Sequence, residues 1–140
     1  MNAKILSLAA GLAVAAALPL TTFASTPSAP GAQVYIISPV NGAEVTSPVT
    51  VRFGLQGMGV APAGMEREKT GHHHLLVDGS VPDLTQPLGG DVKHFGGGQT
   101  EVQLELAPDT HTLQLILGDH MHQPHNPPVV SEQITINVVQ

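Results

Sequence analysis

The chain has no cysteine and no tryptophan, and it has few aromatic or basic residues. Without cysteine it can form neither a disulfide nor a thiolate-ligated copper site, and it offers no cysteine nucleophile. One tyrosine and three phenylalanines provide little of the stacking surface that sugar-binding proteins use. Five Lys and Arg against eleven Asp and Glu give a formal net charge of −6, so nucleic acid is not an expected partner.

Catalytic motifs are missing as well. The chain has no Gly-x-Ser-x-Gly elbow, no His-Glu-x-x-His helix and no phosphate-binding glycine loop. The run Gly96-Gly97-Gly98 lacks the strand, loop and helix context that a phosphate cradle needs. We therefore predict that the protein is not an enzyme.

The first 24 residues have the organisation of a secretory signal peptide. Lys4 supplies the positive charge, residues 5–20 form an apolar run, and residues 22–24 provide the small-residue exit. Because the run is short for a membrane span and no stop-transfer cluster follows, we predict cleavage after Ala24 rather than a retained anchor. The protein is therefore expected to be periplasmic or secreted, without stable membrane insertion after cleavage.

The remaining residues predict one all-β domain. Residues 25–32 (STPSAPGA) are interpreted as a flexible linker, and residues 33–140 show short apolar stretches bounded by turn residues, without a helical period. The predicted strands are 33–38, 43–46, 49–55, 73–77, 100–106, 111–117 and 131–139. This pattern favours an immunoglobulin-like β-sandwich of about seven antiparallel strands.

Histidine is the residue type that suggests a function. Seven of the eight histidines lie inside or beside the segments 57–71, 78–93 and 118–129, which do not fit the strand pattern. Long segments of this kind are usually functional or disordered, and imidazole is the commonest protein ligand for borderline transition metals. The sequence therefore predicts a metal site with the candidate ligands His72, His73, His74, His94, His120, His122 and His125. The eighth, His111, is interpreted as a surface or hydrogen-bonding residue.

Strand geometry leaves two alternatives for the histidine triplet. Residues i and i+2 point to the same face, so His72 and His74 project together while His73 points the other way with Leu75 and Val77. If Leu75 and Val77 face the core, His72 and His74 are the ligand candidates and His73 is a buried or edge residue. If Leu75 and Val77 face outward, His73 is the ligand candidate and His72 and His74 point toward the core.

Two further predictions concern the neighbours of these histidines. Asp119 is a candidate to orient a ligand imidazole through its other ring nitrogen. Thioether sulfur from Met58, Met65 or Met121 would favour reduced copper over zinc if it joined the site.

Four separated motifs carry a resemblance to a known family. They read GHHHLLVD at 71–78, HFGGGQTE at 94–101, HTLQLILGD at 111–119 and HQPHNPPV at 122–129. Together they resemble the DUF4399 family of small exported bacterial domains, over roughly residues 38–138. The resemblance implies shared histidine-bearing segments but no assigned activity. Some members have an additional histidine before His-Phe-Gly; here residues 91–93 are Asp-Val-Lys, which would leave the site one donor short if that histidine is a ligand elsewhere.

Two functions are consistent with these observations. The first is an exported histidine-rich domain that binds a transition metal ion, copper first and zinc second, in envelope metal handling. The alternative is a non-catalytic cell-envelope module that recognises a protein, peptide or glycan, a frequent use of this fold. A metal-dependent enzyme is a third alternative, and it would need an open coordination position beside a pocket.

Overall fold

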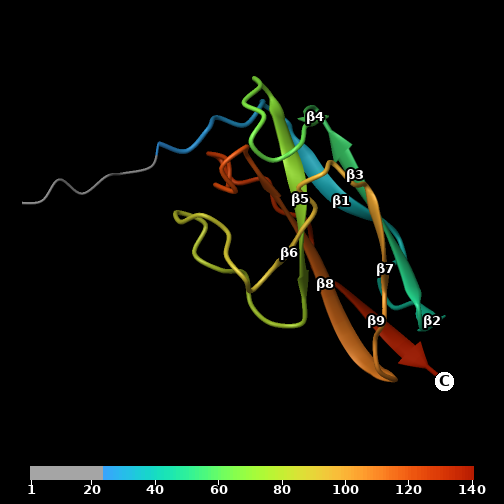
Figure 1. Ribbon diagram of the computed structural model, residues 1–140. Helices are drawn as coiled ribbons and strands as arrows, with labels where there is room; N and C mark the ends of the chain where they lie inside the picture. The colour runs from blue at the N-terminus through green and yellow to red at the C-terminus, as the bar shows by residue number, and fades with distance from the viewer. Residues whose placement is uncertain (1–23) are drawn as a thin grey trace, which may run out of the picture.

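The computed structural model describes residues 24–140, so nearly all of the predicted signal peptide lies outside the described residues. Within residues 24–140 the chain has nine strands and no helix, which confirms the all-β prediction (Figure 1). The strands are β1 (Gln33–Ser38), β2 (Glu44–Thr46), β3 (Val49–Gln56), β4 (Gly59–Val60), β5 (Thr70–Val77), β6 (Lys93–His94), β7 (Glu101–Leu104), β8 (Asp109–Gly118) and β9 (Ile134–Val139). Among these described residues there is no helix with the length and hydropathy to cross a bilayer.

The strands form two sheets. One has the order β1-β3-β7, and the larger one has the order β2-β9-β8-β5, with β4 and β6 both pairing with the remaining edge of β5. Five of the seven strand pairs are antiparallel, whereas β2 pairs with β9 and β4 with β5 in parallel. The sequence did not predict β4 and β6, because two residues are too few to show an alternation.

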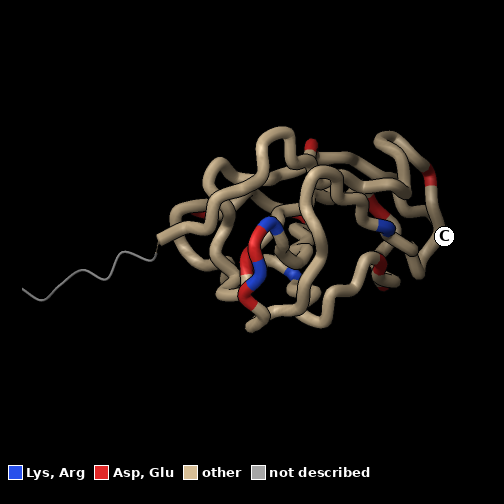
Figure 2. Tube along the Cα trace, turned by 90° about the horizontal axis from the view of Figure 1, so that it is seen from above, with Lys and Arg blue, Asp and Glu red and all other residues tan. Residues whose placement is uncertain are grey.

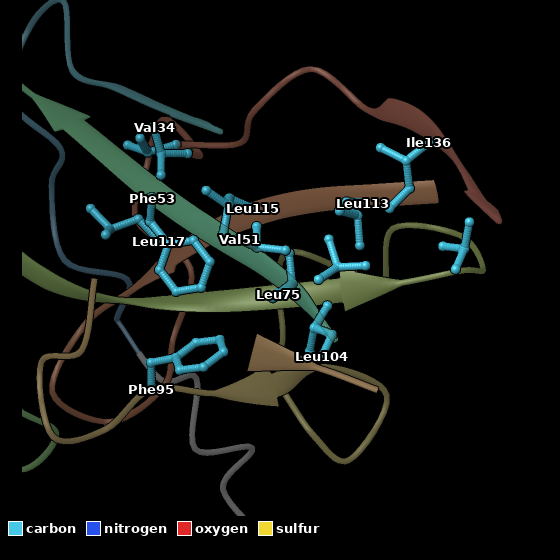
Figure 3. Packing of buried hydrophobic residues seen from close by; sticks show 13 residues of the cluster. Val34, Val51, Phe53, Leu75, Phe95, Leu104, Leu113, Leu115, Leu117 and Ile136 are labelled. Carbon is cyan, nitrogen blue, oxygen red and sulfur yellow. The ribbon is translucent and has the colours of Figure 1, made fainter. Parts of the chain in front are cut away.

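The main core lies between the two sheets. Strand β3 directs Val51 and Phe53 inward, and β8 directs Leu113, Leu115 and Leu117 toward them from the larger sheet (Figure 3). All five side chains are buried, as the period-two alternation of the sequence predicts. Each contributes about 1.5–3 kcal/mol by leaving water, and this burial stabilises the packing of the two sheets in a chain that has no cysteine.

Strand β5 is unusual because both of its faces are buried. Its Leu75 joins the main core, whereas Leu76 packs on the outer face of the larger sheet with Ile116 of β8. Leu88 and Val92, from the long loop after β5, cover this second cluster. Figure 1 shows that loop in yellow, on the side of the larger sheet away from β1, β3 and β7. The side chains of β5 that point away from the main core, such as that of Leu76, therefore lie on the outer face, where the loop covers Leu76.

The segment predicted to be a flexible linker makes specific contacts. Thr26 and Ser28 flank a parallel bridge between Pro27 and Asn126, with hydrogen bonds from Asn126 N to Thr26 O (3.0 Å) and from Ser28 N to Asn126 O (3.2 Å). The Ser28 hydroxyl also donates to the carbonyl oxygen of Pro127 at 2.8 Å. The linker prediction, based on composition, did not anticipate this pairing, because backbone hydrogen bonds do not depend on apolar side chains.

Charged residues occupy few positions along the described chain (Figure 2). The basic residues that lie closest in sequence, Arg67 and Lys69, alternate with Glu66 and Glu68. Arg52 is paired with Glu101 at 3.2 Å, and both side chains are exposed. Opposite charges are thus interspersed rather than separated.

His111 lies outside the histidine-rich loops and is held by two acceptors. Its Nδ1 lies 2.8 Å from Asp78 Oδ2 and its Nε2 lies 2.9 Å from the carbonyl oxygen of Ala107, so both ring nitrogens act as donors. The hydrogen bond to Asp78, helped by the one to Ala107, raises the pKa of His111 above 6.5. A raised pKa in the folded state means that the stabilisation is complete below pH 6.5 and is lost as the pH rises through that pKa.

We therefore expect Asp78→Asn to lower the free energy of unfolding by up to about 1 kcal/mol near pH 6, because half of the Asp78 side chain is exposed to solvent, and to have little effect near pH 9. Urea unfolding at the two pH values measures this difference. The amide oxygen of the variant can still accept the hydrogen bond from Thr112 N, whereas the acceptor that faces His111 is replaced by an amide group. An equal loss at both pH values would contradict the assignment of a charged imidazole.

Candidate metal centre

Four histidines converge on the outer face of the larger sheet. His72 and His74 come from β5, His94 from β6, and His122 from the loop that follows β8. One ring nitrogen from each lies within 4.8 Å of the corresponding atom of every other. The shortest distances all involve His122 Nδ1, which lies 3.0 Å from His72 Nε2, 3.3 Å from His74 Nε2 and 3.2 Å from His94 Nδ1. This group could hold a metal ion.

Strand register brings three of the four together. In the antiparallel pair β5–β6, His74 is directly opposite His94. In the pair β5–β8, His72 is opposite Gly118, after which β8 ends and a turn leads to His122. Leu75 and Val77 pack toward the main core, so His72 and His74 share the outer face. The orientation that the sequence left open is therefore the one in which His72 and His74 project together away from the core.

Burial keeps the two strand histidines neutral. His72 and His74 are fully buried, and desolvation, followed by the neighbouring imidazoles, lowers the pKa of His72 to about 4 and that of His74 to about 3. Burial also lowers the pKa of His122, with a contribution from His94. A neutral imidazole has a free lone pair, which is the form that coordinates a metal ion.

The exposed member of the group has a defined tautomer. His94 Nε2 lies 2.8 Å from the carbonyl oxygen of Gly89, so it donates the ring proton to that oxygen. The lone pair of His94 is therefore on Nδ1, the atom that faces His122. A backbone carbonyl that fixes the tautomer of a histidine in this way is a frequent partner of metal-ligating imidazoles.

Hydrogen bonding alone does not satisfy the three short contacts at His122. Its Nδ1 either donates one proton or accepts with one lone pair, so it forms one good hydrogen bond to a neighbouring ring nitrogen. Since His94 Nδ1 carries a lone pair, the remaining contacts place lone pairs or N–H groups against one another. A cation among the four nitrogens would accept a lone pair from each of them, and these attractions would outweigh the unfavourable contacts between the rings.

Three of the spacings match those of coordinated ligands. Nitrogen ligands at about 2.0–2.1 Å from a tetrahedral ion lie about 3.3–3.4 Å apart, close to the 3.0–3.3 Å at His122, and all four nitrogens lie within 4.8 Å of one another. His94 is exposed and His122 is half-buried, so an ion can enter from solvent on this side.

The structure places the other predicted ligands outside this group. His73 points into the main core, where its ring packs 5.2 Å from that of Phe53 and neither nitrogen has a hydrogen-bond partner. His125 is buried and bridges backbone carbonyls, with Nε2 at 3.1 Å from Thr70 O and Nδ1 at 3.4 Å from Leu117 O. His120 is half-buried in the same turn as His122, but it is not a member of the group.

The neighbours of the site also differ from expectation. Asp119 makes no hydrogen bond to an imidazole nitrogen; its carboxylate accepts hydrogen bonds from Thr26 Oγ1 and from the backbone of Met121 and Gln123. Met58 packs against the main core, and the side chains of Met65 and Met121 are mostly exposed. The group itself consists of imidazole nitrogen donors.

Two glycines contribute to the site in ways that sequence reasoning missed. A Cβ on Gly118 would lie 2.5 Å from His74 Cε1, so the missing side chain makes room for that ring. Gly89 contributes only its carbonyl oxygen, which holds His94. The position of Gly118 at the end of an alternating strand was the available signal, whereas nothing in the sequence distinguishes Gly89 from Gly90.

Comparison with known proteins agrees with the motif resemblance. Neither a curated protein nor a solved structure matches the chain. The family described as "Domain of unknown function (DUF4399)" matches residues 51–139, a segment that includes all four converging histidines. The matched segment is more than half of the sequence, so the chain belongs to the DUF4399 family.

Proposed function

We propose that this protein binds a divalent transition metal ion through His72, His74, His94 and His122, with copper preferred over zinc. The observation that supports it is the set of three contacts at His122 Nδ1, at 3.0, 3.2 and 3.3 Å, which a single proton cannot satisfy. Four imidazole donors suit copper and zinc, and the general order of affinity for such donors places Cu²⁺ above Zn²⁺.

The physiological setting is part of the same proposal. An amino-terminal signal would take the domain out of the cytoplasm, into a space where it takes part in handling the ion. Two buried ligands and two more accessible ones suit a protein that keeps an ion yet leaves it reachable from solvent.

Calorimetric titration of the tag-free protein with Cu²⁺ and with Zn²⁺ tests the proposal. We expect one saturable site per chain, with Cu²⁺ binding more tightly than Zn²⁺. A dissociation constant weaker than ~10 μM for both ions, equivalent to roughly −7 kcal/mol, would overturn the proposed function.

A further inference from the structure

The turn that carries His122 is organised around one buried carboxylate. Asp119 is only 3% exposed, and its Oδ1 accepts hydrogen bonds from the backbone N–H groups of Met121 (2.8 Å) and Gln123 (3.0 Å). The backbone of Asp119 closes the same turn, because its N donates to Gln123 O at 2.9 Å and its O accepts from His122 N at 3.0 Å. Asp119 thus fixes the residues on both sides of His122.

His122 needs this support because its backbone is left-handed. Its φ is 62°, a conformation that a residue with a Cβ atom adopts infrequently. In this conformation its Nδ1 reaches His72, His74 and His94. An ordinary right-handed or extended backbone at this position would direct the ring elsewhere.

A second anchor comes from the amino-terminal segment. Thr26 Oγ1 donates to Asp119 Oδ2 at 2.6 Å, and the segment around Thr26 is itself paired with Asn126. Both carboxylate oxygens of Asp119 are therefore used for holding the turn. Burial raises the pKa of Asp119, but the hydrogen bonds from Thr26, Met121 and Gln123 outweigh it, so the net pKa is lowered and the group stays ionised.

We infer that Asp119 is a positioning residue of the metal centre, which holds His122 in its left-handed conformation, and that Thr26 fastens Asp119 from the amino-terminal segment. This inference rests on the proposed function. It assigns a role in the site to Asp119 and Thr26, which are not themselves ligands. Thr26 is 93 positions before Asp119 in the chain.

A double-substitution cycle with Cu²⁺ tests the inference. Asp119→Ala should weaken Cu²⁺ binding by about 10–100-fold, the usual effect of removing a residue that supports a ligand. Its Cu²⁺ electron paramagnetic resonance spectrum should match that of His122→Ala, because both variants lose the same nitrogen donor. In the His122→Ala background, Asp119→Ala should cause no further loss, since the two residues act as one unit.

Conservative variants keep the test decisive if Asp119→Ala does not fold. Asp119→Asn retains Oδ1 as acceptor for both amides and should keep most of the affinity. Thr26→Val removes only the hydroxyl donor and should weaken binding by less than Asp119→Ala does. In the metal-free protein, the NMR Cα shift of His122 should show a left-handed backbone in wild type and in Asp119→Asn.

The outcomes separate the two proposals. If wild type binds no metal, the proposed function fails and the inference fails with it. If wild type binds, the inference alone is overturned when Asp119→Ala and Thr26→Val bind as wild type does. It is also overturned when Asp119→Ala weakens the His122→Ala protein by the same factor as wild type.

Discussion

Replacing His94 and His122 together with alanine should weaken Cu²⁺ binding by about 100–10,000-fold. Removing a residue that supports a metal ligand lowers the metal affinity by about 10–100-fold. Removing a ligand itself should lower the affinity by at least as much, so the effects of removing two ligands multiply. Both side chains reach solvent, so their removal leaves no fully buried cavity. Calorimetry with Cu²⁺ at neutral pH measures the change.

The chain provides a matched control for this experiment. His120 lies two residues before His122 in the same turn but outside the four-histidine group. His120→Ala should bind Cu²⁺ as wild type does. If it loses as much affinity as His122→Ala, the loop donates a different ligand from the one that the geometry indicates.

Replacing the buried His73 with leucine should make the metal-free protein more resistant to acid. Burial lowers the pKa of His73 to about 4, partly opposed by the nearby backbone of Gly54 and Gln99, whereas its ordinary value is 6.5. A lowered pKa in the folded state means that stability is complete above pH 6.5 and is lost as the pH falls toward 4, because protons bind the unfolded chain first. Between pH 7 and pH 5 this single residue should cost wild type roughly 2 kcal/mol of unfolding free energy.

Leucine has a similar volume and does not titrate, so it removes this loss while filling the space beside Phe53. Urea unfolding at both pH values, in the presence of a chelator, should show a smaller decrease for His73→Leu than for wild type. The decrease in His73→Leu should not vanish, because burial also lowers the pKa of His72 and His74. Identical decreases in both proteins would show that His73 is not a buried neutral imidazole.

The sequence predicted most of the sandwich because its alternating strands are long enough to show a period. Strand β1 matches its predicted range, and the inward leucines of β8 lie where the alternation places them. The second apolar cluster was less visible. It joins Leu76 and Ile116 to Leu88 and Val92 from a loop, and those two loop residues have no periodic neighbours that would mark them as buried.

The composition of the sequence predicts that a histidine site exists, but the sequence identifies only some of the histidines that form it. A histidine triplet on a strand has two possible orientations, and the choice depends on contacts made by Leu75 and Val77 with distant strands. His120 and His122 could not be distinguished, because their difference is a positive φ set by the hydrogen bonds of Asp119. The role of Thr26 depends on pairing between segments that are far apart in sequence, which local patterns do not reveal.

The positions of the four converging imidazoles along the chain determine when they can act. In the unfolded polypeptide His72 and His94 are some twenty residues apart in sequence, and His122 is 50 residues beyond His72. The ring nitrogens come within reach of one ion only after β5 has found β6 and β8. Under the proposed function, an ion is therefore captured only by molecules whose larger sheet is already assembled.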